Sequence, residues 1–308
     1  MQQGWLISFG AVLFWALLSA VTRVVLVRFD LDPWGFSFVQ LTTGGLVLLL
    51  FSVKAPFAKT SFLRPSTWII GVFRVLSASL YTALLAIVSV LEAGIMGAIS
   101  MSVVAISVWL VFARPPARGE WIGHLVVLAC AAALVAKVDP SIRTITLTLV
   151  FANTICVVGM TVLAELHPDN LSEDPAVRIR FSGTVLLVTA GMFFLARLAQ
   201  TGLSAEFWDW HMLLFGTLVG IFLRAPSMVL AFSSIRLVGS QNYSAATAFL
   251  PLFGMLMEHL FYLLGWINVT RFQLDFLYLG IGTAIGAITV IAARILARRG
   301  HAPSLETK

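Results

Sequence analysis

An arginine and a proline stand close together in the apolar stretch TLVGIFLRAPSMVLAF, residues 217–232. If this stretch crosses a bilayer, Arg224 costs about 2.5–3.5 kcal/mol at its centre, because the guanidinium keeps its charge there. Pro226 lacks a backbone donor and interrupts the helical ladder one turn back. Both features are tolerated at membrane depth only beside a packed helix or a water-filled cavity. The pair therefore predicts a polar cavity in which a guanidinium can bind an anionic group.

Two more arginines fall inside apolar segments. Arg23 lies late in residues 5–27, and Arg74 lies about 10 Å inside residues 67–90 by helical rise. Either side chain could instead extend to the headgroups. Arg224 is too deep for that, so it either pairs with Glu258 or lines the cavity. We expect Arg74 and Arg224 to bind substrate.

The segment 241–265 supplies the opposite charge. Glu258 could balance a charged group on the substrate or exchange a coupling proton, and the neighbouring His259 titrates near neutral pH. We expect both to act in coupling or as counter-ions, and we expect Pro226 and Pro251 to act as hinges. The alternatives are a permanent ion pair, a histidine without a role and ordinary proline bends.

Uncharged side chains complete the expected substrate site. Trp15 and Thr22 share one face of the first segment, and a mid-membrane indole suits stacking on a planar or cationic solute. The remaining candidates are Gln40, Ser77, Tyr81 and Asn153. Core packing of Trp15 and bridging of helices by the two amides are the simpler alternatives.

The elements that must position these residues follow from the composition. The chain is 59% hydrophobic and 11% charged, with a mean hydropathy of +0.97, whereas soluble domains carry about 25% charged residues. About 20 apolar residues span a bilayer. The segments of that kind are residues 5–27, 34–53, 67–90, 93–112, 120–137, 145–164, 178–199, 211–235, 241–265 and 272–295. The sequence therefore predicts an all-α integral membrane protein with ten transmembrane helices.

The basic residues predict the orientation. Twelve lysines and arginines lie in loops on the side of the two termini and five on the other side. This positive-inside bias places both termini in the cytoplasm, so the net charge of +6 reflects topology and not nucleic acid binding. The other loop charges, including those of residues 165–180, are expected to be solvated. Cys130 and Cys156 are expected to pack inside helices, and no metal, cofactor or catalytic residue is expected.

A repeat divides the chain near residue 140. Residues 71–94 align without gaps on residues 216–239, with five identities that include Gly71/Gly216 and Gly94/Gly239. An odd number of helices in each half inverts the second half, which is usual in secondary transporters. We therefore expect two inverted five-helix repeats, 1–140 and 141–300, around a central cavity, followed by a cytoplasmic tail, 301–308.

Three stretches carry a family resemblance: GAVLFWALLSAVTR (10–23), YTALLAIVSVLEAGIMGAIS (81–100) and FLPLFGMLMEHL (249–260). With the ten short helices, they resemble the drug/metabolite transporter superfamily in its ten-helix EamA-like branch. The resemblance implies a carrier of small polar solutes such as amino acids or phosphorylated metabolites. Gln40 stands where the family commonly has an arginine.

The resulting hypothesis is a secondary transporter, not an enzyme. It would move an anionic or zwitterionic, amino-acid-like metabolite by alternating access, with proton coupling as an option. The expected setting is a monomer in a bacterial inner membrane. A lipid or amphiphile flippase is the alternative. An enzyme acting on lipid headgroups is less favoured, because such sites need clustered carboxylates or a nucleophile with its base.

Overall fold

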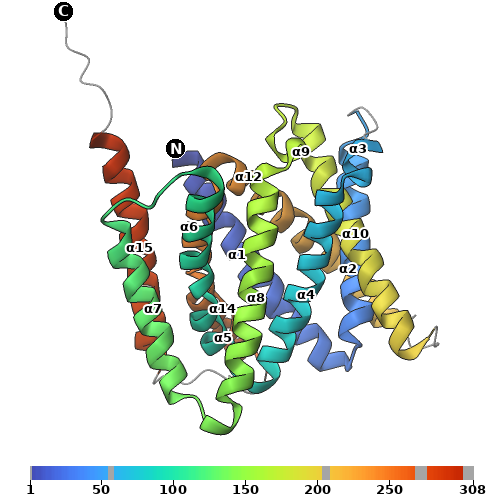
Figure 1. The fold of residues 1–308 in the computed structure, drawn as a ribbon. Helices are drawn as coiled ribbons and strands as arrows, with labels where there is room; N and C mark the ends of the chain where they lie inside the picture. Colours follow the sequence, from blue (N-terminus) through green and yellow to red (C-terminus); the bar gives the residue numbers. More distant parts are fainter. Residues whose placement is uncertain (1, 55–58, 203–208, 268–275, 301–308) are drawn as a thin grey trace, which may run out of the picture.

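The computed structural model describes residues 2–54, 59–202, 209–267 and 276–300, and all regular structure in these ranges is helical (Figure 1). The elements are α1 (Gln2–Phe29), α2 (Pro33–Phe51), α3 (Lys59–Leu63), α4 (Pro65–Ile87), α5 (Val90–Gly97), α6 (Ile99–Phe112), α7 (Glu120–Lys137), α8 (Pro140–Leu166), α9 (Pro168–Leu171), α10 (Pro175–Thr201), α11 (Trp210–Val219), η2 (Gly220–Arg224), α12 (Ala225–Val238), α13 (Ser240–Thr247), α14 (Leu250–Leu263) and α15 (Leu277–Gly300).

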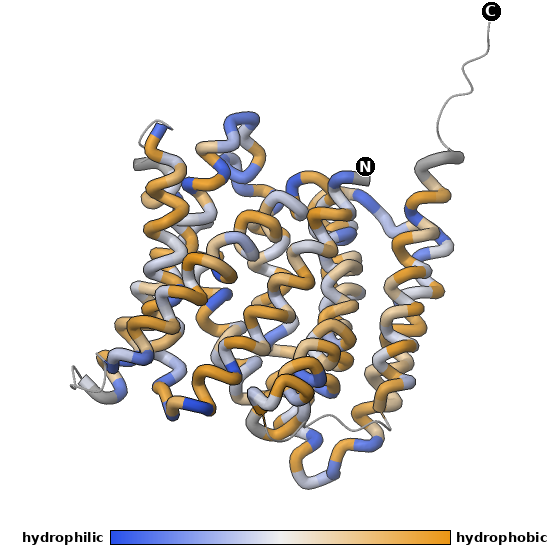
Figure 2. Tube along the Cα trace, turned by 180° about the vertical axis from the view of Figure 1, so that it is seen from behind, coloured by the Kyte–Doolittle hydropathy of each residue, from blue (hydrophilic) through white to orange (hydrophobic). Residues whose placement is uncertain are grey.

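Ten helical stretches in the described ranges are long and apolar enough to cross a membrane. The expected all-α membrane fold is therefore confirmed. The start of α1 and the end of α15 lie at the same end of the bundle, and hydrophilic residues gather at its two ends (Figures 1 and 2). The expected tail, 301–308, and the start of the expected last segment at residue 272 lie outside the described ranges.

Two spans are interrupted in a matching way. The fourth span joins α5 to α6 at Ala98, and the ninth joins α13 to α14 through Ala248 and Phe249. Both pairs have 8 and then 14 residues. The second break lies just before Pro251, in the middle of the ninth span, and the expected role of Pro251 as a hinge stays a prediction. Pro251 lies in the first turn of α14, where its missing amide leaves no helical bond unmade.

The pairing of spans is compatible with an inverted repeat. The second span packs against the seventh (α2 on α10), and the fifth against the tenth (α7 on α15). The third pairs with the sixth (α4 on α8), as the eighth does with the first (α12 on α1). An inverted repeat relates each span to the one five places further along, counting on from one after ten. Applied to these pairs, this relation returns the same set of pairs. The division at residue 140 itself stays a prediction.

Glycines bring the paired helices into backbone contact. A Cβ on Gly45 would lie 3.0 Å from the Gly183 carbonyl oxygen between α2 and α10. A Cβ on Gly123 would overlap the Gly286 carbonyl oxygen between α7 and α15. Small residues at such contacts allow membrane helices to gain van der Waals packing where the hydrophobic effect offers little.

The gap-free repeat alignment holds at only one end. Gly71 packs on α10 and Gly216 on α2, which are equivalent positions in an inverted repeat. Gly94, by contrast, is inside α5, whereas Gly239 precedes α13 with φ +84°. The alignment loses register because the eighth span, Trp210–Val238, is 29 residues long and α4 only 23.

Several charges expected in solvated loops are buried. Arg180 donates to the Ser52 carbonyl oxygen at 2.6 Å, and Arg197 donates to Asp32 at 2.6 Å. Both arginines belong to α10, and their partners stand at opposite ends of α2. These two bonds hold α10 along α2. The expectation that the loop charges are solvated is therefore wrong for this pair of helices.

Candidate functional site

Arg224 ends a π-helical turn in the middle of the eighth span. The turn, η2, forms just before Pro226, and Ala225 donates its amide to the Gly220 carbonyl, five residues back. The wider turn fits against α2, because a Cβ on Gly44 would lie 2.8 Å from the Gly220 oxygen. It would also lie 3.5 Å from Cγ of Arg224. π-turns of this kind are frequent at functional sites.

Three of the expected site residues meet at mid-membrane depth. The Arg224 Cζ lies 5.1 Å and the Arg74 Cζ 5.7 Å from the centroid of the Trp15 ring. Trp15 is near the middle of α1, and Arg224 is 14 residues from either end of the eighth span, about 21 Å by helical rise. Two guanidiniums therefore share one indole, in cation–π geometry, in the centre of the bundle.

In the part of the chain that the structure describes, no carboxylate neutralises either guanidinium. Among the described residues, Arg74 and Arg224 form no ion pair with a carboxylate, and each has a buried Nε without an acceptor. Arg74 contacts the Met160 sulfur at 3.8 Å and interacts electrostatically with Tyr243 and Arg224. The two charges are no farther apart than the sum of their distances to Trp15. Their repulsion is roughly 1.5 kcal/mol or more at an effective dielectric constant of 20.

Glu258 does not pair with Arg224 in the structure. It accepts a hydrogen bond from Arg23 at 2.7 Å, and the Glu258 side chain is 5% exposed against 28% for Arg23. Arg23 is therefore held by a carboxylate instead of extending freely to the headgroups. His259 is exposed and stacks near Tyr262, with ring centroids 6.4 Å apart. These contacts of the two expected coupling residues, Glu258 and His259, are therefore not with Arg74 or Arg224.

The remaining expected site residues are dispersed. Ser77 donates to the Asn153 Oδ1 at 2.7 Å, which supports the bridging alternative for that amide. Gln40 is 2% exposed and Thr22 carries a buried hydroxyl, and neither side-chain oxygen has a partner in the described residues. Tyr81 packs against an apolar cluster to which α4, α5, α7, α8 and α15 contribute. The guanidiniums of Arg74 and Arg224 lie over the Trp15 ring, on which a solute is expected to stack.

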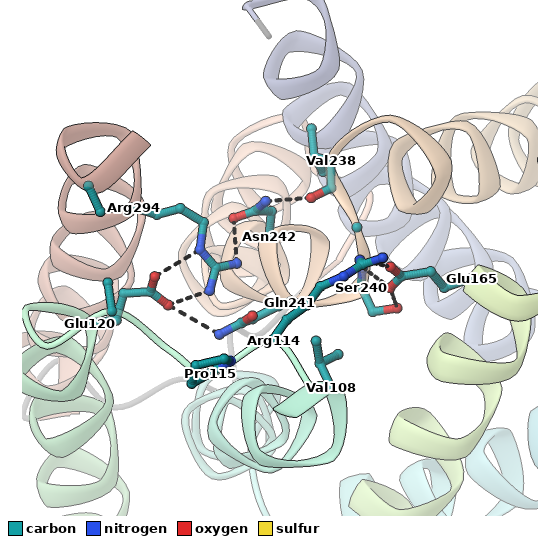
Figure 3. Close-up of a pocket in the computed structure, with 13 residues that line it drawn as sticks. Val108, Arg114, Pro115, Glu120, Glu165, Val238, Ser240, Gln241, Asn242 and Arg294 are labelled. Atoms are coloured by element: carbon teal, nitrogen blue, oxygen red, sulfur yellow. Dashed lines mark hydrogen bonds and ion pairs between the residues drawn. The ribbon is translucent and has the colours of Figure 1, made fainter. Parts of the chain in front are cut away.

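A second polar cluster lies at the end of the bundle that carries both termini. It surrounds a pocket of about 380 Å³ between α6, α7, α8, α13 and α15 (Figure 3). We call it the terminus-end network. Its members are Arg114, Glu120, Glu165, Ser240, Gln241, Asn242 and Arg294.

The terminus-end network ties both sides of the pocket to the first turn of α13. Arg294 of α15 donates Nε to Glu120 of α7 at 2.9 Å and Nη1 to Asn242 at 2.9 Å. Glu165 of α8 accepts from Arg114 at 2.9 Å and from the Ser240 amide at 2.7 Å. Figure 3 shows these side chains pointing toward one another across the pocket. The pairs join the helices at this end.

Sequence reasoning missed Tyr243 and the whole terminus-end network. A signal was present in SQNYS, residues 240–244, a polar run inside an otherwise apolar span. The side chains of Ser240, Gln241 and Asn242 are all buried and hydrogen-bonded. Glu120 and Arg294, 174 residues apart, carried no comparable signal.

Residues 2–136 match the EamA-like transporter family, which confirms the resemblance to the drug/metabolite transporter superfamily. A crystal structure of another protein has the same fold, with a TM-score of 0.63 over 97% of this chain and 99% of that one. The two sequences are 17% identical, so the likeness concerns the fold alone. No curated protein matches the sequence.

Proposed function

We propose that this chain, a membrane transporter of the drug/metabolite type, is a secondary carrier that moves a small anionic or zwitterionic metabolite by alternating access. The observation that carries the proposal is the pair of guanidiniums on Trp15, which no carboxylate of the described residues neutralises. Intramembrane charges of this kind mark substrate paths by default. The substrate's anionic group would complete the hydrogen bonding of Arg74 and Arg224.

Alternating access requires the pathway to close at each end in turn. The terminus-end network supports a state closed at the end of the termini, because its ion pairs join α7 to α15 and the loop after α6 to α8. The positive-inside bias would make this the cytoplasmic end. The carrier would then face away from the cytoplasm. Proton coupling at Glu258 would require its pair with Arg23 to separate during the cycle.

Uptake into liposomes tests the proposal. The purified protein is reconstituted and supplied with labelled amino acids, organic acids and phosphorylated metabolites. We expect uptake of at least one solute, and we expect R224A to lower it at least tenfold while the variant remains folded. R28A is the matched control, because Arg28 is exposed in the last turn of the same helix as Trp15. Normal uptake by R224A would refute the site.

A further inference from the structure

We infer that the substrate of the Trp15 site is a small organic dianion, such as a dicarboxylate or a phosphate monoester. The inference rests on the proposed function and narrows its substrate class. It excludes zwitterions and cations as the preferred solutes. Its basis is the balance of charge and of hydrogen-bond donors around the two arginines.

Across the described ranges of the chain, the charge around the site is uncompensated. Arg74 and Arg224 bring two positive charges that act on each other, and the other titratable group that acts on Arg74 is the hydroxyl of Tyr243. The acidic residues of the described spanning helices have other partners. Glu92 accepts from the Ser89 amide, Glu120 pairs with Arg294, Glu165 with Arg114 and Glu258 with Arg23. A ligand must therefore supply the missing negative charge itself.

The donors are also unfilled. Within the described residues the Arg224 guanidinium donates no hydrogen bond, and Arg74 donates only to a sulfur, a weak acceptor. Each guanidinium offers five N–H groups in a planar fork that suits carboxylate and phosphate oxygens. A dianion presents enough oxygens for both forks. An amino-acid zwitterion presents one carboxylate and adds an ammonium that both guanidiniums repel.

The two arginines stand close enough to share one small solute. Both are within 6 Å of the same ring centroid, at 5.1 and 5.7 Å. Trp15 fixes them by cation–π contact, so part of the cost of ordering the side chains is met before a ligand arrives. The site is therefore arranged for two anionic groups joined by a short linker, or for one doubly charged phosphate.

Thermal stability of the purified full-length protein tests the inference. The probes are succinate, glycerol phosphate, lactate, alanine and putrescine at equal ionic strength. A ligand that binds the folded state raises the melting temperature. We expect succinate or glycerol phosphate to raise it more than lactate does, and alanine and putrescine to leave it unchanged. R74Q and R224Q should each weaken dianion binding at least tenfold, and R28Q should not.

The outcomes separate the two proposals. Arginine-dependent stabilisation by alanine, without a response to dianions, overturns the dianion inference and leaves the carrier intact. Dianion binding that R74Q and R224Q do not alter overturns the site assignment. Absence of both binding and liposome uptake for all probe classes overturns the carrier as well. If R224Q fails to fold, R224K replaces it, with binding expected between that of the wild type and that of R74Q.

Discussion

At the scale of single residues, Trp15 explains how two like charges can remain deep in the bundle. Each guanidinium–indole contact contributes about 0.5–2 kcal/mol, with the larger value applying where water is excluded. Two such contacts together contribute about 1–4 kcal/mol, against a repulsion between the arginines of roughly 1.5 kcal/mol or more. The indole is therefore a positioning group for Arg74 and Arg224.

Replacing Trp15 should separate packing from positioning. We expect W15L to lower the melting temperature and to weaken anion binding at least tenfold, because an aliphatic side chain removes both cation–π contacts. W15F keeps a ring and should retain part of the binding. Titration of the purified variants with the anion that stabilises the wild type measures both. Equal affinities for W15L and W15F would contradict the role of the ring.

His167, which lies between α8 and α9, makes the stability depend on pH. Burial lowers its pKa to about 4, although the Asp169 carboxylate raises it, and the charge of Arg64 lowers it further. Its Nδ1 accepts from the Asp169 amide, and Nε2 bonds Thr67 at 3.1 Å. Well above pH 6.5, His167 is neutral in both the folded and the unfolded state. Below it the unfolded state binds the proton first, so stability falls as the pH drops from about 6.5 to about 4.

The variant H167N should flatten that dependence. Asparagine can still cap α9, as His167 does, but it does not titrate. We expect the wild type to lose roughly 2–3 kcal/mol more than H167N between pH 7 and pH 4. Melting temperatures of both proteins in detergent, measured across this range, give the difference. Parallel curves would show that His167 titrates normally in the folded state.

At the scale of elements, the paired helices depend on backbone contact at glycines. In α7 an added Cβ at Gly123 would overlap the Gly286 carbonyl of α15, whereas Gly191 of α10 has nothing within 4 Å of an added Cβ. Alanine is favoured over glycine in a helix by about 1 kcal/mol. Overpacking costs about 1–3 kcal/mol. Replacing glycine by alanine should therefore destabilise the protein at residue 123 and stabilise it at residue 191.

We expect G123A to lower the melting temperature and G191A to leave it unchanged or raise it. The comparison is matched, because both glycines lie inside spanning helices and both lose the same backbone freedom. Thermal unfolding of the two purified variants measures the effect. A stabilised G123A would mean that α7 and α15 are not in backbone contact.

The elements also show how far the sequence determines the fold. Hydropathy alone located the ten spans, since lipid requires runs of apolar residues. The break at Ala98 follows Gly97, but a single glycine is common inside membrane helices and did not reveal it. The π-turn before Pro226 was only partly foreseeable: proline predicted a disturbed ladder, but the added residue depends on the fit to Gly44 of α2.

At the scale of the whole molecule, the long-range ion pairs were the least predictable feature. Depth in the membrane identified Arg74, Arg224 and Trp15 as candidates, because charge in hydrocarbon is costly wherever it occurs. The sequence could not assign Glu258 to Arg23, which lies 235 residues away, since pairing depends on how helices pack. The same holds for Glu120 and Arg294. A costly charge in the membrane can be recognised from the residues around it in the sequence, whereas its ion-pair partner can lie anywhere in the chain.

In the proposed carrier, the terminus-end network would hold this end closed and would separate when it opens. Glu120 is 1% exposed, and removing one partner of a buried ion pair costs about 3–5 kcal/mol, because the other charge is left uncompensated. That cost applies to the closed arrangement. Opening hydrates Arg294, so the loss of Glu120 should shift the population toward molecules open at this end.

Thiol labelling at the pocket measures the shift. Val108 lines the pocket and is 3% exposed, so V108C in a background with C130S and C156S reports its accessibility. We expect E120Q to raise labelling by a membrane-impermeant reagent severalfold over the parent, and only in inside-out vesicles, where the proposed cytoplasmic end faces the reagent. E173Q is the control, because Glu173 is exposed outside the pocket. Unchanged labelling in E120Q would mean that the ion pairs do not hold this end closed, and labelling in right-side-out vesicles alone would reverse the assigned orientation.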